Sequence, residues 1–396
     1  MAAHRLSDTV QQLAVPDWNR RVFDALVPIP DGTSYNAYLV TGSDKTVLVD
    51  TADPSMAAEF ELLLAAVPHL DHVVSLHAEQ DHSGLIPMVL ARYPAATVLT
   101  SPKAKPMLAD LLGVPAERVV TVADGERLSL GNRTIQFVHT PWVHWPETMC
   151  ALLVEERLLF SCDFFGSHLA SSTAVLDDPA RVYEATKRYF ATIMMPFAKF
   201  IDRHLKTVAE LDVATIAPSH GPIHPDPKAM IAAHRQWISG PLADRVVIAF
   251  ESMHHSTKQM VGMLGDSLVR QGVAVDIFQL GSADLGRLAM AMVDAATIVL
   301  GTPTVAGGPH PSVLHAAYVA SILRPRAKHL GVVGSAGWSA AKTVKMLADL
   351  LSSLPAEVLE PVFATGMPKE ADRAALEALA STIVAKHAAL GIHAQA

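Results

Sequence analysis

The N-terminal part of the chain mixes short apolar runs of strand length with segments that have helical spacing. Apolar residues three and four positions apart predict helices, and shorter apolar or alternating runs predict strands. The expected strands are Ser34–Thr41, Lys45–Asp50, His72–His77 and Thr215–Pro218, with β-rich stretches at Val119–His139 and Thr148–Phe160. The expected helices are Pro54–Val67, Gly84–Tyr93 and a long helical region over Asp178–Leu211. Such a mixture, with loops at the strand ends, is typical of a layered α/β sandwich.

From Arg245 onward the pattern becomes regular, because apolar strands alternate with helices. The expected strands are Arg245–Phe250, Ala274–Leu280, Thr297–Gly301, His329–Gly334 and Glu357–Thr365. The expected helices are Thr257–Gln271, Ala283–Asp294, Ser312–Leu323, Ser339–Leu354 and Lys369–Leu390. This alternation predicts a parallel, doubly wound sheet that binds its ligand at the carboxyl ends of the strands. The helix-breaking pair Gly240-Pro241 marks a boundary, so we predict two domains, 1–242 and 243–396.

The composition narrows the function classes. The chain has 396 residues, of which 50% are hydrophobic and 18% charged, so disorder is excluded and large cores are expected. A net charge of −8 argues against nucleic-acid binding. The first fifteen residues lack the pattern of a signal peptide, and no apolar stretch reaches membrane-spanning length, so we expect a cytoplasmic protein without membrane association. Nineteen histidines accompany only two cysteines, which excludes a disulfide framework.

Four potential metal ligands lie within six residues between a predicted strand and a predicted helix: His77, Glu79, Asp81 and His82. Histidine together with carboxylate is a ligand set of iron, manganese and zinc. The alternative is a polar loop that caps the following helix, since aspartate and serine are good N-caps. Capping needs one such residue and not four, so the metal interpretation is favoured.

Three later residues are also potential ligands placed at strand ends. His144 lies in a rigid aromatic loop, Asp163 follows a predicted strand, and His220 follows the strand that ends at Pro218. Taken alone, a histidine at such a position is more often a core or surface residue. Together with the first motif these residues make seven ligands, enough for two metal ions and a bridging carboxylate.

The pattern His-x-Glu-x-Asp-His, followed by His144, Asp163 and His220, resembles the metallo-β-lactamase fold and, more narrowly, the flavodiiron proteins. Segments 34–39 and 193–197 are also similar to that family, so the resemblance covers nearly the whole chain. Hydrolytic members of the fold usually carry a histidine where this chain has Glu79. An anionic oxygen ligand at this position shifts the preference from zinc toward redox-active iron.

The resemblance implies a complete ligand assignment. His77, Glu79 and His144 would hold one non-haem iron, and Asp81, His82 and His220 the other, with Asp163 bridging the two. In some relatives the histidine at the position of His82 is displaced by water. These seven residues would bind the metal ions and would not act as general acids or bases. Tyr189 is a candidate for a residue whose hydroxyl group lies near the metals.

The resemblance also implies the architecture. The expected fold is α/β, with a metallo-β-lactamase-like αββα sandwich as the diiron domain (1–242). A flavodoxin-like, doubly wound, five-stranded parallel sheet would follow as the FMN-binding domain (243–396).

Three loops of the second domain resemble the flavin-binding loops of that family. A helix N-terminus with hydroxyl groups suits the FMN phosphate, and the loops after the third and fourth strands would hold the flavin ring. The sequence departs from the family at His255, where a glycine is usual, and at Ala336, where an aromatic residue is common. The candidate FMN-binding residues are Ser252, Met253, His254, His255, Ser256, Thr257, Pro303, Thr304, Val305, Ala306, Gly307, Ser335, Ala336, Gly337 and Trp338.

The implied activity is that of an oxidoreductase. Electrons from an external donor would pass through FMN to two irons per chain, which would reduce O₂ to water, NO to N₂O, or both, with O₂ reduction favoured. The chain has no Cys-x-x-Cys pair and therefore no built-in rubredoxin centre. The donor would be a rubredoxin-like protein or a reduced deazaflavin coenzyme. The family also implies a head-to-tail homodimer or a dimer of such dimers.

Two other function classes remain open from the sequence. One is a dinuclear metal hydrolase with a flavodoxin-like appendage, in which the metal pair activates water. The other is a redox sensor or electron carrier without turnover. Glu79 argues against the hydrolase, and the complete set of seven ligands argues against the sensor.

Overall fold

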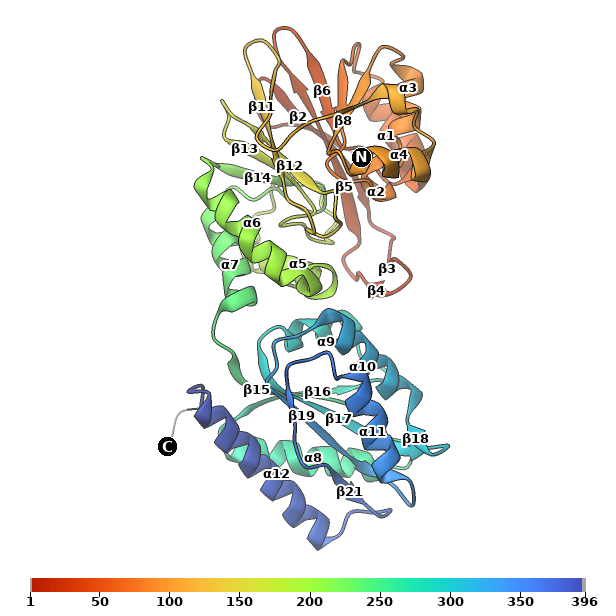
Figure 1. Cartoon of the computed structure of the whole chain (residues 1–396), viewed down its shortest axis with the longest axis vertical. Helices are drawn as coiled ribbons and strands as arrows, with labels where there is room; N and C mark the ends of the chain where they lie inside the picture. The colour runs from red at the N-terminus through yellow and green to blue at the C-terminus, as the bar shows by residue number, and fades with distance from the viewer. Residues whose placement is uncertain (1, 394–396) are drawn as a thin grey trace. The chain divides into compact units, whose positions relative to one another are not determined.

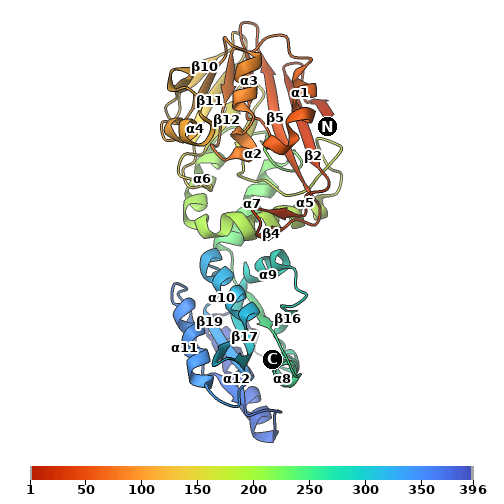
Figure 2. The same ribbon diagram turned by 90° about the vertical axis from the view of Figure 1, so that its right-hand side faces the viewer.

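The computed structural model describes residues 2–393, and this part of the chain forms two compact units (Figures 1 and 2). The first unit contains the chain up to Phe190 together with Phe197–Ile238. The second contains Ala191–Pro196 and the chain from Ser239 onward. The units therefore change at Ser239, close to the predicted boundary, whereas the short stretch Ala191–Pro196 was not expected to group with the second unit.

The first unit contains two mixed β-sheets. The seven-stranded sheet has the order β1-β2-β5-β6-β7-β8-β9, antiparallel from β1 to β6 and parallel from β6 to β9. Its strands are β1 (Ala2–Arg5), β2 (Val10–Asp17), β5 (Thr33–Thr41), β6 (Thr46–Val49), β7 (His72–Val74), β8 (Thr97–Thr100) and β9 (Val119–Thr121). The five-stranded sheet runs in chain order through β10 (Arg127–Ser129), β11 (Thr134–His139), β12 (Met149–Leu153), β13 (Leu158–Cys162) and β14 (Thr215–Pro218). A separate hairpin joins β3 (Val22–Phe23) to β4 (Val27–Pro28).

The alternation of side chains along the central strands creates a core on each face of the first sheet. Tyr35 and Ala37 of β5 contribute to the core that contains Phe60 and Ile86 from the helices. Tyr38 and Val40 contribute to the opposite core, together with Phe137, Phe160 and other residues of the second sheet. Successive residues of a strand point to opposite faces, so one strand serves both cores. This arrangement confirms the predicted sandwich.

Helices complete the first unit. The helices beside the first sheet are α1 (Ala57–Leu64), α2 (Gln80–Ser83), α3 (Ile86–Arg92) and α4 (Ala104–Leu112). The helices α5 (Pro179–Tyr189), α6 (Ala198–Glu210) and α7 (Pro227–Ser239) lie beside the second sheet (Figure 1). The expected helical region Asp178–Leu211 is interrupted by a π-helical turn at Phe190–Met194, and α4 and α7 were not expected.

The second unit contains the predicted parallel sheet, with strand order β16-β15-β17-β19-β20. The strands are β15 (Ala243–Phe250), β16 (Ala274–Gln279), β17 (Ala295–Val305), β19 (His329–Ser335), β20 (Glu357–Val358) and β21 (Val362–Ala364), and β21 also pairs with β19. The helices are α8 (Ser256–Arg270), α9 (Leu285–Met292), α10 (Pro311–Leu323), α11 (Ala340–Leu350) and α12 (Glu370–Ala389). Apolar residues of α8 and α12 form one core with the sheet, and α9, α10 and α11 cover its other face (Figure 1).

Two details of this unit differ from the sequence prediction. The third strand was expected to end at Gly301 but continues to Val305 and pairs with β18 (Gly308–Pro309). The turn between them places Ala306 at φ +49° and Gly307 at φ +79°, the left-handed conformation that a tight hairpin requires. The predicted fifth strand is divided into β20 and β21.

Within residues 2–393, no helix combines the length and the apolar character needed to cross a membrane.

Candidate metal centre and cofactor loops

The first ligand motif spans the turn from β7 into α2. His77 lies in the loop after β7, and Glu79 is the extended residue that precedes α2, with φ −61° and ψ 142°. Asp81 and His82 lie on α2 (Gln80–Ser83), a short helix that was not expected, whereas the expected helix Gly84–Tyr93 is present as α3 (Ile86–Arg92). Gly84 ends this short helix where a Cβ atom would come within 2.6 Å of the Pro54 side chain. Together with the Gln80 carbonyl oxygen, which would lie 2.3 Å from that Cβ atom, Pro54 leaves room only for glycine at this position.

The other three ligand candidates follow strands of the second sheet. His144 lies in the loop between β11 and β12, Asp163 follows β13 directly, and His220 follows β14. Asp163 and His220 are 1% exposed, and the His144 side chain is 13% exposed. The strand ends of both sheets thus contribute side chains to one largely buried cluster.

His77, Glu79, His144 and Asp163 form the first group, in which the potential ligand atoms lie within 4.8 Å of one another. Glu79 Oε2 lies 3.0 Å from His77 Nε2 and 3.2 Å from His144 Nε2. Asp163 Oδ2 lies 3.5 Å and 3.4 Å from the same two nitrogens. Two imidazoles and two carboxylates therefore converge on one small volume.

Asp81, His82 and His220 form the second group, again within 4.8 Å. His220 Nε2 lies 3.1 Å from Asp81 Oδ2 and 3.2 Å from His82 Nε2. His82 Nε2 lies 3.4 Å from Asp81 Oδ1. This set of two imidazoles and one carboxylate matches the donors expected for a second ion.

Asp163 faces both groups with different oxygens. While Oδ2 points toward the first group, Oδ1 lies 3.1 Å from His82 Nε2 and 3.3 Å from His220 Nε2 in the second. A carboxylate with one oxygen directed toward each set of ligands has the geometry of a bridge between two metal ions.

The hydrogen-bonding state of the cluster fits bound cations. His220 Nδ1 donates to the Ser34 carbonyl at 2.8 Å, so in the neutral ring Nε2 carries a lone pair. This lone pair converges with carboxylate oxygens, which are also acceptors. Both oxygens of Asp81 and Oδ2 of Asp163 are buried without a hydrogen-bond partner among the described residues. Buried acceptors that converge in this way need positive charge between them, which metal ions supply.

The close approach of carboxylates and histidines in this cluster also shifts the pKa values of both kinds of side chain. Burial lowers the pKa of His77, but hydrogen bonds with Glu147 and Glu79 outweigh it and raise the pKa to about 10. His144 behaves alike, because Asp163 and Glu79 overcome burial and raise its pKa to about 10. Burial raises the pKa of Asp163, but the nearby histidines hold it well below its usual range. The carboxylates therefore stay ionised in the buried cluster.

Tyr189 lies beside the candidate bridge. Its hydroxyl donates to Asp163 Oδ1 at 2.7 Å, and its ring contacts the His168 ring at a centroid distance of 4.8 Å. Burial and the charge of Asp163 raise the pKa of Tyr189 well above its usual range, so the phenol remains a donor. The structure thus places this hydroxyl against the candidate bridging carboxylate.

Two carboxylates behind the histidines were missed by the sequence analysis. Glu147 Oε1 accepts from His77 Nδ1 at 2.7 Å. Asp50 Oδ2 lies 3.9 Å from His82 Nδ1, and burial raises the pKa of Asp50 to about 6. Glu147 follows His144 by three residues and Asp50 ends a predicted strand, which are the only signals the sequence contains.

The first candidate flavin loop follows β15, the second consists of the end of β17 and its turn into β18, and the third begins at the last residue of β19; these three long strands are neighbours in the sheet. In the first loop (252–257) His255 precedes α8 with φ +68°, and Ser252 Oγ accepts from the Lys258 N–H at 3.2 Å. Thr257 is 1% exposed, and its hydroxyl lacks a hydrogen-bond partner among the described residues. An unpaired buried hydroxyl at a helix N-terminus suits a phosphate ligand.

The second and third loops lie next to each other. Thr304 Oγ1 is 3.5 Å from Thr343 Oγ1 of α11, the helix that follows the third loop. The Ala336 N–H donates to the Ala364 carbonyl at 3.0 Å, and the Ser335 hydroxyl to the Gly366 carbonyl at 2.8 Å. Several side chains of these loops are solvent-exposed; Trp338 is 68% exposed and Met253 in the first loop 50%. Exposed aromatic and apolar side chains at this sheet edge could contact a planar ring.

Residues 33–221 match the model of a family described as "ODP family beta lactamase". The chain is 34% identical over 354 residues to the type A flavoprotein fprA of Rhodobacter capsulatus, covering 86% of this chain and 81% of the relative. It is 33% identical over 326 residues to the coenzyme F420H(2) oxidase of Methanothermobacter marburgensis (79% and 80% covered). It is 32% identical over 363 residues to the nitric oxide reductase of Moorella thermoacetica (89% and 90% covered).

A solved structure extends the similarity to the whole fold. The rubredoxin oxygen:oxidoreductase from the anaerobe Desulfovibrio gigas superimposes with a TM-score of 0.94 at 30% identity. The match covers 98% of this chain and 99% of that chain. The two units described above therefore occur together, in the same order, in a protein of known structure.

Proposed function

The chain belongs to the flavodiiron protein family, and from this premise we propose that it is an oxidoreductase that reduces O₂ to water, NO to N₂O, or both. Electrons from an external donor would reach a diiron centre in the first unit through FMN in the second. The names of the relatives, which refer to O₂, NO, rubredoxin and coenzyme F420H(2), support these substrate and donor classes.

The observation that carries the proposal is the division of the seven ligands around Asp163. One oxygen of this carboxylate faces His77 and His144, and the other faces His82 and His220. Two ions held by a shared carboxylate can act on one small diatomic substrate together. Glu79 gives the first group an anionic oxygen ligand, which favours iron over zinc.

Bound iron would supply the redox chemistry, and the side chains of this chain would set its conditions. Two ferrous ions and one reduced flavin together hold four electrons, the number that converts O₂ to water. His77, Glu79, His144, Asp81, His82 and His220 would bind the ions, and Asp163 would fix the spacing between them. Tyr189 would orient Asp163 through the hydrogen bond from its hydroxyl. The burial of the cluster limits access of water to the reacting centre.

FMN is proposed for the second unit on the same grounds. The Thr257 hydroxyl and the N-terminus of α8 would bind the phosphate, and the loops after β17 and β19 would contact the ring. His255 replaces a glycine that is usual in this loop and adopts the left-handed conformation that glycine favours. The backbone at His255 therefore has a conformation that glycine adopts more readily than histidine does.

The electron donor and the assembly are also part of the proposal. The sequence contains no Cys-x-x-Cys pair, and both cysteines are buried, so a rubredoxin-like protein or a reduced deazaflavin coenzyme would supply the electrons. A head-to-tail homodimer, or a dimer of such dimers, would bring FMN of one subunit next to the diiron centre of the other. The hydrolase alternative is not favoured, since the relatives are named as oxidoreductases.

Metal and flavin analysis of one anaerobic sample, followed by consumption assays, tests the proposal. We expect two irons and one FMN per chain, and consumption of O₂ or NO that depends on a reductant. Asp163→Asn should abolish turnover while FMN content is retained, because the substitution affects only the first unit. Two zinc ions per chain, with reductant-independent hydrolysis and no gas consumption, would contradict the proposal and support a hydrolase.

A further inference from the structure

We propose that Glu147 is the positioning residue for His77, and that it determines how tightly the first group holds its metal ion. The inference rests on the proposed diiron centre but concerns a residue that is not one of its ligands. Glu147 lies in the loop between β11 and β12, three residues after His144. One loop would therefore supply a ligand of the first ion and also the support of a second ligand.

The contact between Glu147 and His77 is short and completely buried. Glu147 Oε1 lies 2.7 Å from His77 Nδ1 and also accepts the Ala78 N–H at 3.0 Å. Both side chains in the pair are 0% exposed. Because the imidazole and the next backbone amide donate to the same oxygen, the ring of His77 is fixed relative to its own backbone.

This contact selects one tautomer of His77. A carboxylate can only accept, so Nδ1 carries a proton, and Nε2, which faces Glu79 and Asp163, is the nitrogen that would give up its proton and bind a metal ion. An ionised carboxylate on the far side of a ligating histidine also makes the imidazole a stronger donor. Glu147 thus combines orientation of the ring with an electronic effect on the metal.

His220 and His82, the two histidines of the second group, are supported differently. His220 Nδ1 donates to the Ser34 carbonyl, which is neutral. The carboxylate nearest His82 Nδ1 is Asp50 at 3.9 Å, beyond direct hydrogen-bond distance. The short hydrogen bond from a histidine to a carboxylate, that of His77 to Glu147, therefore belongs to the first group. The first group should bind its metal ion more tightly than the second group does.

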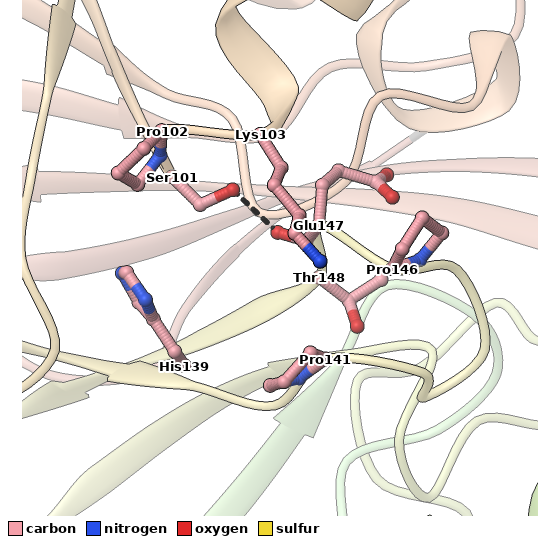
Figure 3. Close-up of a pocket in the computed structure, with 8 residues that line it drawn as sticks. All are labelled: Ser101, Pro102, Lys103, His139, Pro141, Pro146, Glu147 and Thr148. Atoms are coloured by element: carbon pink, nitrogen blue, oxygen red, sulfur yellow. Dashed lines mark hydrogen bonds between the residues drawn. The ribbon is translucent and has the colours of Figure 1, made fainter.

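The surroundings hold the Glu147 loop in place. The Ser101 hydroxyl donates to the Glu147 carbonyl at 2.6 Å, as Figure 3 shows. The rings of His77 and Trp145 pack in a T-shaped arrangement, with centroids 5.0 Å apart and planes at 88°. Glu147 also borders a cavity of about 270 Å³ that is lined by Lys103 and His139, among others (Figure 3). Lys103 is exposed and has no hydrogen bond to Glu147 among those of the described residues, so it offers a control at the same location.

Glu147→Gln tests the inference with little change in shape. The amide oxygen can still accept from His77 and Ala78, but the negative charge is lost. Glu147→Ala removes both the acceptor and the charge. The anaerobic affinity of the purified full-length protein for Fe²⁺, measured by competition with a chelator, should fall about tenfold in the first variant and about a hundredfold in the second.

The reduction potential separates positioning from general stability. We expect the potential of the diiron centre to rise in Glu147→Gln, since loss of the anionic partner makes the imidazole a weaker donor to the ferric state. The FMN potential should stay unchanged, and Lys103→Gln should resemble the wild type in both measurements. Wild-type Fe²⁺ affinity and potential in Glu147→Gln, or a fall in thermal stability alone, would refute the role of Glu147. A wild-type protein that binds no iron would instead contradict the proposed function.

Discussion

The hydrogen bond between Tyr189 and Asp163 offers a sharp test of the candidate bridge. Tyr189→Phe removes a single hydroxyl and keeps the ring, which is 3% exposed and contacts the rings of His168 and His220. The lost bond is 2.7 Å long and joins a neutral donor to an ionised acceptor. Such bonds contribute about 1.5–3 kcal/mol, roughly twice the value for two neutral groups.

The surroundings of Asp163 place the expected loss near the lower end of that range. Asp163 Oδ1 still faces His82 at 3.1 Å and His220 at 3.3 Å, so the carboxylate is not left unpaired. We expect the free energy of unfolding of the first unit to fall by about 2 kcal/mol. The bridging carboxylate should also become a stronger donor, which lowers the reduction potential of the diiron centre.

Anaerobic urea unfolding of the metal-loaded protein measures the first effect. Flavin fluorescence reports on the second unit, so its transition can be separated from that of the first. Tyr318→Phe, on α10 of the second unit, controls for effects of the substitution itself, because this tyrosine is 54% exposed and its loss of a hydroxyl should change stability by less than about 0.5 kcal/mol. An unchanged transition and an unchanged potential in Tyr189→Phe would show that the hydroxyl does not support Asp163.

Three further predictions concern other parts of the chain. Glu79→His replaces the anionic ligand by a neutral one, so the zinc-to-iron ratio of the purified protein should rise and its consumption of O₂ or NO should fall. An iron content that stays at the wild-type value would contradict the assignment of Glu79 as a ligand. His255→Gly removes the backbone strain of a non-glycine residue in the left-handed conformation. The free energy of unfolding of the flavin-free protein, measured in urea, should therefore rise by about 1 kcal/mol. A loss of stability would mean that the His255 side chain makes a favourable contact. Burial lowers the pKa of His234 to about 3, whereas the unfolded chain should titrate near 6.5. Between these values the unfolded state binds one more proton, so stability falls by about 1.4 kcal/mol per pH unit as the pH drops, and His234→Gln should reduce this slope in urea unfolding at several pH values.

The convergence of the candidate ligands could be predicted because the local sequence places each of them at or just after the end of a strand. His77, Glu79, Asp81 and His82 follow one apolar strand without interruption, and a turn from strand to helix brings their side chains together. His144, Asp163 and His220 each follow a strand of the second sheet, and the two sheets meet in a single core. That Asp163 would bridge the two groups of ligands was implied only by the family resemblance.

Contacts that depend on distant loops could not be predicted. Glu147 and His77 are 70 residues apart, and their contact requires the conformation of the whole 140–148 loop. The strands β1 and β2 were missed because the N-terminal segment shows no clear alternation, although it pairs with β5 along eight residues. The extension of β17 depends on pairing with β18, which the Gly-Pro sequence of β18 does not suggest.

The nineteen histidines show why composition alone was a poor guide and what separates a ligand from a core residue. His168, His224 and His234 are as deeply buried as the predicted ligands, yet burial lowers the pKa of each, and His168 and His234 reach about 3. His77 and His144 are raised to about 10 although burial opposes the shift. The difference in pKa comes from neighbouring carboxylates. Glu79 and Asp163 face both His77 and His144. A hydroxyl or a backbone carbonyl faces each of the other three histidines. Buried carboxylates that face histidines need positive charge, which protonated imidazoles or metal ions can supply, and the convergence of seven candidate ligands at this cluster favours two metal ions.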